Sequence, residues 1–97
     1  MNAQICEAIT GRRRLRCFYN GGSRVVEPHV YGAGREGVDL LRVFQVSGHS
    51  NSGVPTGWKL FHADALSEIT LTDETFPAPR AEYNSDDEVM ATIYCRL

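Results

Sequence analysis

Four arginines stand within five residues near the start of the chain, and their type and spacing indicate binding chemistry. They are Arg12, Arg13, Arg14 and Arg16. A guanidinium group offers a planar fork of donors that matches the oxygens of a phosphate or a carboxylate. The run is therefore either a strip that contacts phosphate, or a set of cations that complements a helix end and the outward face of a strand. Proteins that bind single strands place exposed aromatic side chains among basic ones, and only Phe18 and Tyr19 follow this run.

A second group of polar and aromatic residues comes from neighbouring predicted strands. Arginine would pair with a negative charge in such a group, and the aromatic rings would stack on a base. The alternative is that each histidine has a structural role and that Glu27 pairs with Arg24, which would leave no charge for a ligand. Taken with the arginine run, the candidate ligand or nucleic-acid site consists of Arg12, Arg14, Arg16, Tyr19, Arg24, His29, Tyr31 and His62.

Catalytic and metal-binding signatures are missing from the sequence. The three histidines and three cysteines have no spacing typical of a zinc site. No P-loop, dinucleotide fingerprint or pair of carboxylates occurs in a recognisable setting. We therefore expect a non-enzymatic protein without a metal or a cofactor.

The composition is that of one ordinary globular domain. The chain has 97 residues, of which 42% are hydrophobic and 23% charged, and its formal net charge is −2. Up to Gly48 it carries seven arginines and four acidic residues, whereas from His49 onward three basic residues face eight acidic ones. This asymmetry permits a local basic face on an acidic protein.

The cysteines and the lack of a long apolar run predict a location. Cys6, Cys17 and Cys95 form no C-x-x-C pair, so we expect reduced, buried thiols. No signal peptide is recognisable, and no apolar run approaches the roughly 20 residues of a membrane helix. We expect a cytoplasmic protein that does not associate with a membrane.

The positions that these residues occupy depend on a helix and a series of short strands. Ile5, Ala8 and Ile9 are spaced as on a helix that ends at Thr10 and Gly11. Alternating or apolar segments then predict five strands, at residues 13–19, 23–28, 38–46, 58–63 and 67–72. Asn20-Gly21-Gly22 predicts a tight turn after the first strand, and Pro28 predicts an end, a bulge or an edge in the second. Residues 47–57 are expected to form a loop.

Five short strands after one helix favour a mainly β fold, a small Sm-like or SH3-type barrel, because closure removes exposed sheet edges. We assign residues 1–76 to the barrel domain, and 77–97 to an extended linker and a C-terminal helix that docks on it. Ser85 and Glu88 have the spacing of a capping box. The last seven residues would also suit a strand. Trp58 is expected to be buried under the terminal helix; the alternative is an exposed side chain that acts as an interaction hot spot.

The order of these features resembles the WYL domain, the small Sm-like sensor barrel of bacterial transcription regulators. The similarity covers roughly residues 5–76 and lies in "ICEAITGRRRLRCFYNGGSRVVEP", "VDLLRVF" and "WKLFHADALSEITL". Val38 and Asp39 stand where the family has its name-giving Trp-Tyr pair, Leu40 keeps the leucine, and Ala65 replaces an arginine. The helix-turn-helix of the regulators is absent. The resemblance implies ligand binding, including nucleic acid, through basic and aromatic residues on the barrel surface.

Two functions follow as expectations. The first is a stand-alone regulatory module that recognises single-stranded nucleic acid, a nucleotide or another small anionic ligand. The second is a protein interaction or assembly module with a decayed ligand site, in which an exposed apolar stripe on the terminal helix would recruit a protein partner or a second copy of the chain.

Overall fold

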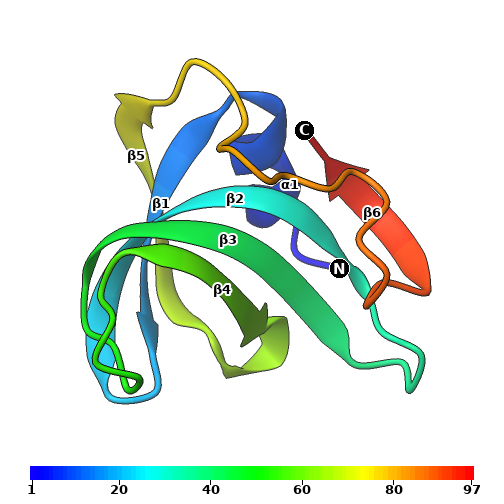
Figure 1. Cartoon of the computed structure of the whole chain (residues 1–97), viewed down its shortest axis with the longest axis horizontal. Helices are drawn as coiled ribbons and strands as arrows, with labels where there is room; N and C mark the ends of the chain where they lie inside the picture. Colours follow the sequence, from blue (N-terminus) through cyan, green and yellow to red (C-terminus); the bar gives the residue numbers. More distant parts are fainter.

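A computed structural model describes residues 1–97 and shows one strongly bent antiparallel sheet with a helix on its inner face (Figure 1). The elements are α1 (Ala3–Thr10), β1 (Arg13–Tyr19), β2 (Gly22–Ala33), β3 (Asp39–Gly48), β4 (Gly57–His62), the 3₁₀ helix η1 (Ala63–Ala65), β5 (Ser67–Thr75) and β6 (Thr92–Arg96). The strand order is β4-β3-β2-β1-β5, with β6 paired to β2.

The predicted N-terminal helix is confirmed. The Asn2 side chain caps α1 by accepting a hydrogen bond from the Gln4 backbone N–H at 2.9 Å. Ile5, Ala8 and Ile9 are buried. They join the inward residues of β1, β2, β3 and β4 in one hydrophobic core, so the helix packs on the inner face of the sheet.

The first hairpin also forms as predicted. Asn20 and Gly21 have positive φ angles of 44° and 93°, which a tight turn between twisted strands requires. Tyr19 pairs with Gly22 across the turn. Along β1, Leu15, Cys17 and Tyr19 are buried and alternate with more exposed residues.

Strand β2 is longer than the predicted segment 23–28 because the chain continues through Pro28 to Ala33. The register of β2 on β3 shifts between Pro28 and Val30, so the proline sits beside a bulge, one of the outcomes that its missing N–H predicted. The first half of β2 pairs with β1, and the second half pairs with β6. Strand β2 thereby pairs with both β1, near the N-terminus, and β6, near the C-terminus.

The predicted C-terminal helix is wrong, because residues 92–96 form strand β6, which was the alternative for the last seven residues. Beyond the end of β1, the backbone of β2 needs a hydrogen-bonding neighbour, and β6 supplies it. The Ala91 N–H donates to the Ala33 carbonyl at 2.8 Å, and the Leu97 N–H donates to the His29 carbonyl at 3.0 Å. Gly32 permits this pairing, since a Cβ there would collide with the Thr92 carbonyl oxygen. Tertiary pairing therefore outweighs the capping pattern.

The closed barrel is not observed either. Strands β4 and β5 are joined through η1 but do not pair, so both are edges of an open antiparallel sheet. The structure thus confirms the mainly β class and the number of strands before residue 76. It shows an open sheet in place of the expected closed barrel.

The expectation of three reduced cysteines is wrong as well. Cys6 in α1 and Cys95 in β6 form a disulfide with a Cα–Cα separation of 5.7 Å, and Cys17 is the free, buried cysteine. The cytoplasmic location stays a prediction. The disulfide does not favour it, because disulfides are rare in reducing compartments. None of the helices has the length and apolar character needed to cross a bilayer.

Candidate functional site

The arginine run is largely engaged with the protein's own atoms. Arg12 donates to the Pro77 carbonyl at 2.8 Å, and Arg13 Nε donates to the Thr72 carbonyl at 2.9 Å. These contacts fasten the start of β1 to the end of β5 and to the residues that follow it. They match the structural interpretation of the run.

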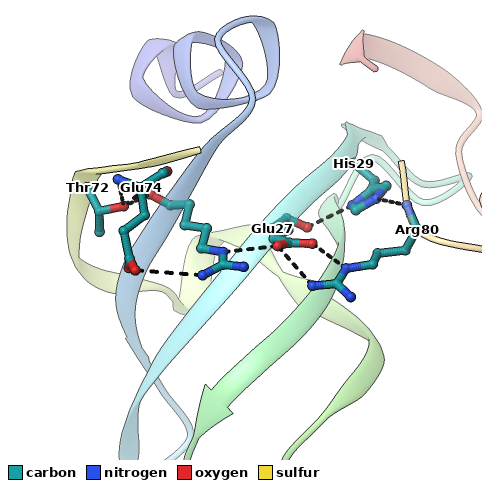
Figure 2. A network of polar contacts seen from close by, with 6 residues as sticks. Glu27, His29, Thr72, Glu74 and Arg80 are labelled. Atoms are coloured by element: carbon teal, nitrogen blue, oxygen red, sulfur yellow. Dashed lines mark hydrogen bonds and ion pairs between the residues drawn. The ribbon is translucent and has the colours of Figure 1, made fainter. Parts of the chain in front are cut away.

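Arg14 belongs to a network centred on the fully buried carboxylate of Glu27 (Figure 2). Arg14 Nε donates to Glu27 Oε2 at 3.0 Å. From the other side, Arg80 donates through Nε to Oε1 at 2.6 Å and through a terminal nitrogen to Oε2 at 3.1 Å. Burial alone would raise the pKa of Glu27, but the hydrogen bonds and charges of Arg80 and Arg14 outweigh it and lower that pKa. The Glu27–Arg24 pair, which the structural alternative invoked, does not form.

His29 extends this network but is closed to ligands. Its Nδ1 donates to the Glu27 backbone carbonyl at 2.8 Å, and its Nε2 accepts the Arg80 backbone N–H at 3.1 Å. Both ring nitrogens of the buried side chain are therefore used, and the ring is the neutral Nδ1–H tautomer. Burial is the main reason that the pKa of His29 is lowered.

Acidic side chains offset the charge of the run. Glu7 and Asp73 lie 3.7 and 3.9 Å from the guanidinium nitrogens of Arg13, and Glu74 lies 3.7 Å from Arg14. Arg16 is the one member of the run with neither an ion pair nor a side-chain hydrogen bond. Phe18, two residues further along the same exposed face of β1, is 38% exposed. The surface thus offers one free guanidinium and one ring instead of a basic strip.

Tyr19 and Arg24 are buried beside each other, and both contribute to the lining of a small depression of about 210 Å³ that also includes Lys59. The buried guanidinium of Arg24 lies 5.2 Å from the ring centres of both Tyr19 and Phe61, and its Nε donates to the Tyr19 carbonyl at 3.2 Å. The Tyr19 hydroxyl accepts the His62 backbone N–H at 3.0 Å. Elsewhere in the core, the hydroxyl of Tyr31 accepts the Asn2 backbone N–H at 2.8 Å. The eight predicted site residues are therefore dispersed over several environments.

Residues 76–91 connect β5 to β6, and we term this segment the strap (Figure 1, orange). The strap covers part of the outer face of the sheet. The Trp58 indole donates to the Ala81 carbonyl at 3.1 Å. Arg42 on β3 forms a two-point ion pair with Asp87, at 2.7 and 3.3 Å. Trp58 is therefore half-buried, but the extended strap contacts it and not the expected terminal helix.

An open groove of about 540 Å³ lies beside the β2–β3 turn. We term this depression the groove. Its lining residues are Gly34, Arg35, Glu36, Val38, Leu40, Leu60, His62, Glu88 and Val89. None of its four ionisable side chains forms an ion pair. The groove is thus a free site with an apolar floor and polar groups at its rim.

A tight turn fixes the position of the groove's arginine. The Gly37 N–H donates to the Gly34 carbonyl at 3.0 Å, and the Gly34 N–H donates to the Val38 carbonyl at 2.8 Å. Gly37 has a φ of 79°, a conformation that favours glycine. Arg35 and Glu36 lie at the tip of this turn.

Of the predicted site residues, His62 alone lines the groove. Arg35, Leu60 and Val89 could not be recognised as neighbours from the sequence, because they come from three distant segments. The Gly34–Gly37 spacing was the one local signal that marked a turn displaying charged residues. The chain matches no protein-family model, no curated protein and no solved structure.

Proposed function

We propose that this chain is a non-enzymatic binding module of WYL-like type whose ligand lies in the groove. The observation that carries the proposal is an open site of about 540 Å³ that combines an apolar floor with unpaired charged groups. This volume is within the range of small-molecule sites, which are mostly apolar with a few orienting polar groups. The ligand is accordingly a small molecule.

The charges at the rim favour an amphipathic carboxylate. Arg35 supplies a guanidinium fork that can hold a carboxylate through two hydrogen bonds. Glu36 and Glu88 place two further charges there, both negative. Together with Arg35 they give these three groups a net charge of −1, which repels a polyphosphate several times more strongly than a ligand with a single charge. A molecule with one carboxylate for Arg35 and an apolar body for the floor is therefore the better match.

The side chains of the groove favour a narrower class of ligand than the sequence predicted. Apart from the imidazole of His62, the groove has no aromatic side chain on which a base could stack, whereas single-strand binding uses basic residues together with several stacking rings. Single-stranded nucleic acid and nucleotides are therefore weaker candidates here than a small carboxylate. The arginine run provides no second basic surface, since most of its members are occupied.

The WYL resemblance supports the same location. Val38, Asp39 and Leu40 stand where the family has its name-giving triplet, and Val38 and Leu40 line the groove. In this chain the triplet position contributes apolar floor instead of aromatic rings. We propose that this replacement shifts recognition from a base towards an aliphatic body.

The test is a calorimetric titration of the wild-type protein, carried out separately with octanoate, with AMP and with a single-stranded oligonucleotide. Octanoate should bind, and Arg35→Ala should weaken it by about 10-fold to 100-fold, because a hydrogen bond to a charged group contributes about 1.5–3 kcal/mol. Arg16→Ala removes an equal charge outside the groove and should leave octanoate binding unchanged. The proposal would be refuted if octanoate did not bind and the oligonucleotide bound to the wild type but not to the Arg14→Ala/Arg16→Ala double variant.

A further inference from the structure

The strap lies on the sheet as a bound peptide would. Its first part, "FPAPRAEY" (76–83), has no regular secondary structure and contains two prolines, which fix φ near −65° and lower the entropy cost of docking. Cross-strand register places Glu27 opposite Phe44, and Phe44 opposite Trp58, on the face beneath it. An acid and two aromatic rings from three adjacent strands thus lie side by side under this segment.

Arg80 is the anchor of the segment. Its guanidinium makes two hydrogen bonds to the buried Glu27 carboxylate, and its carbon centre lies 4.4 Å from the centre of the Phe44 ring. A cation over an aromatic face and beside a desolvated carboxylate is held by both. The pocket therefore recognises arginine through its charge, its planarity and its hydrogen-bonding fork.

The sheet also recognises the backbone on both sides of that anchor. His29 Nε2 accepts the Arg80 N–H at 3.1 Å, and the Trp58 indole donates to the Ala81 carbonyl at 3.1 Å. Main-chain hydrogen bonds combined with one side-chain pocket are the usual means by which a folded domain binds an extended peptide. Aromatic walls around a central arginine are typical of binding hot spots.

We propose that this face, formed by Glu27, His29, Phe44 and Trp58, is a peptide-recognition surface for a Pro-X-Pro-Arg segment, and that the strap occupies it in cis. The partner is a protein that presents such a segment in extended form. Arg14 remains on Glu27 when the strap leaves, so the vacated pocket keeps a partly compensated carboxylate. This surface shares no residue with the groove, although the last part of the strap supplies Glu88 and Val89 to the groove lining.

Tethering explains why a partner must compete. A segment fixed at both ends has an effective concentration of at least millimolar order, so a free peptide binds the wild type weakly. The strap is held by Arg80 and, further along, by the ion pair between Asp87 and Arg42. Removing both side-chain anchors should open the surface to a peptide in trans.

The test uses the double variant Arg80→Ala/Asp87→Ala and a fluorescent peptide of sequence FPAPRAEY, with binding measured by anisotropy. We expect the variant to bind at least about 10-fold more tightly than the wild type. The matched peptide FPAPAAEY should bind the variant at least about 10-fold more weakly, since it lacks the charge-assisted hydrogen bonds. A folded variant that binds neither peptide, or both equally, overturns the proposal.

A second measurement decides the matter if the double variant does not fold. Trp58 is the single tryptophan of the chain, so its indole N–H gives one identifiable NMR signal. Millimolar FPAPRAEY should shift this signal in the wild-type protein and FPAPAAEY should not. Equal or absent shifts overturn the proposal. Octanoate binding tests the groove independently, so the failure of either proposal is distinguishable from the failure of the other.

Discussion

Replacing Glu27 with glutamine should destabilise the protein more than the corresponding amide replacement of any other acidic residue. The side chain is fully buried and accepts hydrogen bonds from two guanidinium groups. Glutamine keeps the shape, but it presents an NH₂ group to one of the arginines and removes the negative charge. Both arginines then remain at the sheet surface without a counter-ion at this point.

The magnitude follows from the exposure of the two partners. Breaking a fully buried ion pair costs about 3–5 kcal/mol. The side chains of Arg14 and Arg80 are 27% and 39% exposed, so water recovers part of the lost interaction. We therefore expect a loss of about 2–3 kcal/mol in the free energy of unfolding. For a chain of this size that corresponds to a fall in Tm of about 10–20 °C.

The assay is urea and thermal unfolding followed by circular dichroism at several pH values. The folded protein lowers the pKa of Glu27 below its ordinary value of 4.5, so the charged form stabilises the fold above that pH and the contribution is lost as pH falls further. The difference between wild type and Glu27→Gln should therefore be full at pH 7 and shrink below pH 4.5.

A matched control keeps the same arginine and changes an exposed partner. Glu74 lies 3.7 Å from Arg14, and its side chain is 62% exposed. Glu74→Gln should change the free energy of unfolding by less than about 0.5 kcal/mol, as exposed pairs contribute little. If Glu27→Gln were as mild as this control, the buried network would not hold the strap to the sheet.

Four further predictions concern the ends of the chain and its interior. Iodoacetamide at pH 8 should modify no cysteine in the native protein, because burial raises the pKa of Cys17 to about 11; mass spectrometry should show one modified thiol after unfolding and three after reduction. Loss of the Cys6–Cys95 disulfide, which spans 89 residues, should cost about 2–5 kcal/mol of unfolding free energy. Burial lowers the pKa of His29 from 6.5, so the free energy of unfolding of the wild type should decrease as pH falls below 6.5. The His29→Asn variant should lose less over the same pH range. Equal slopes of unfolding free energy against pH for the two proteins would show that this ring does not stay neutral. Gly32→Ala should destabilise β6 and expose its amides to hydrogen exchange, and unchanged protection would contradict the close approach of β2 and β6.

Local patterns were sufficient to predict the elements whose structure depends on neighbouring residues. The helix before Gly11, the Asn20-Gly21 turn and the alternation along β1 all follow from side-chain spacing and φ preferences. The same patterns predicted the bulge as one outcome at Pro28. These features need no knowledge of the distant chain.

Features that depend on distant contacts were missed. The segment after Ser85 carries a capping pattern, but the unpaired half of β2 binds it as a strand, and no local rule contains that partner. The disulfide between the first and last elements was missed for the same reason, since its cysteines are far apart in sequence. Arg80, in a segment expected to be a linker, proved to be the main partner of Glu27.

The candidate site changed for a physical reason. An arginine run predicts a binding surface only if its charges are free, and sequence does not show which acids will lie beside it. Folding placed Glu27 and Glu74 on Arg14, and Glu7 and Asp73 on Arg13. The unpaired arginine that lies beside an apolar groove is Arg35, which a turn positions after β2.

The most direct test of the ligand site is an amide NMR titration of the wild-type protein with octanoate and, separately, with a single-stranded oligonucleotide. We predict that octanoate shifts the amide signals of Gly34 to Leu40, of Leu60 and of His62, and that the oligonucleotide leaves Arg16 and Phe18 unchanged. Shifts confined to Arg16 and Phe18 on addition of the oligonucleotide, with no response of the groove to octanoate, would contradict the account.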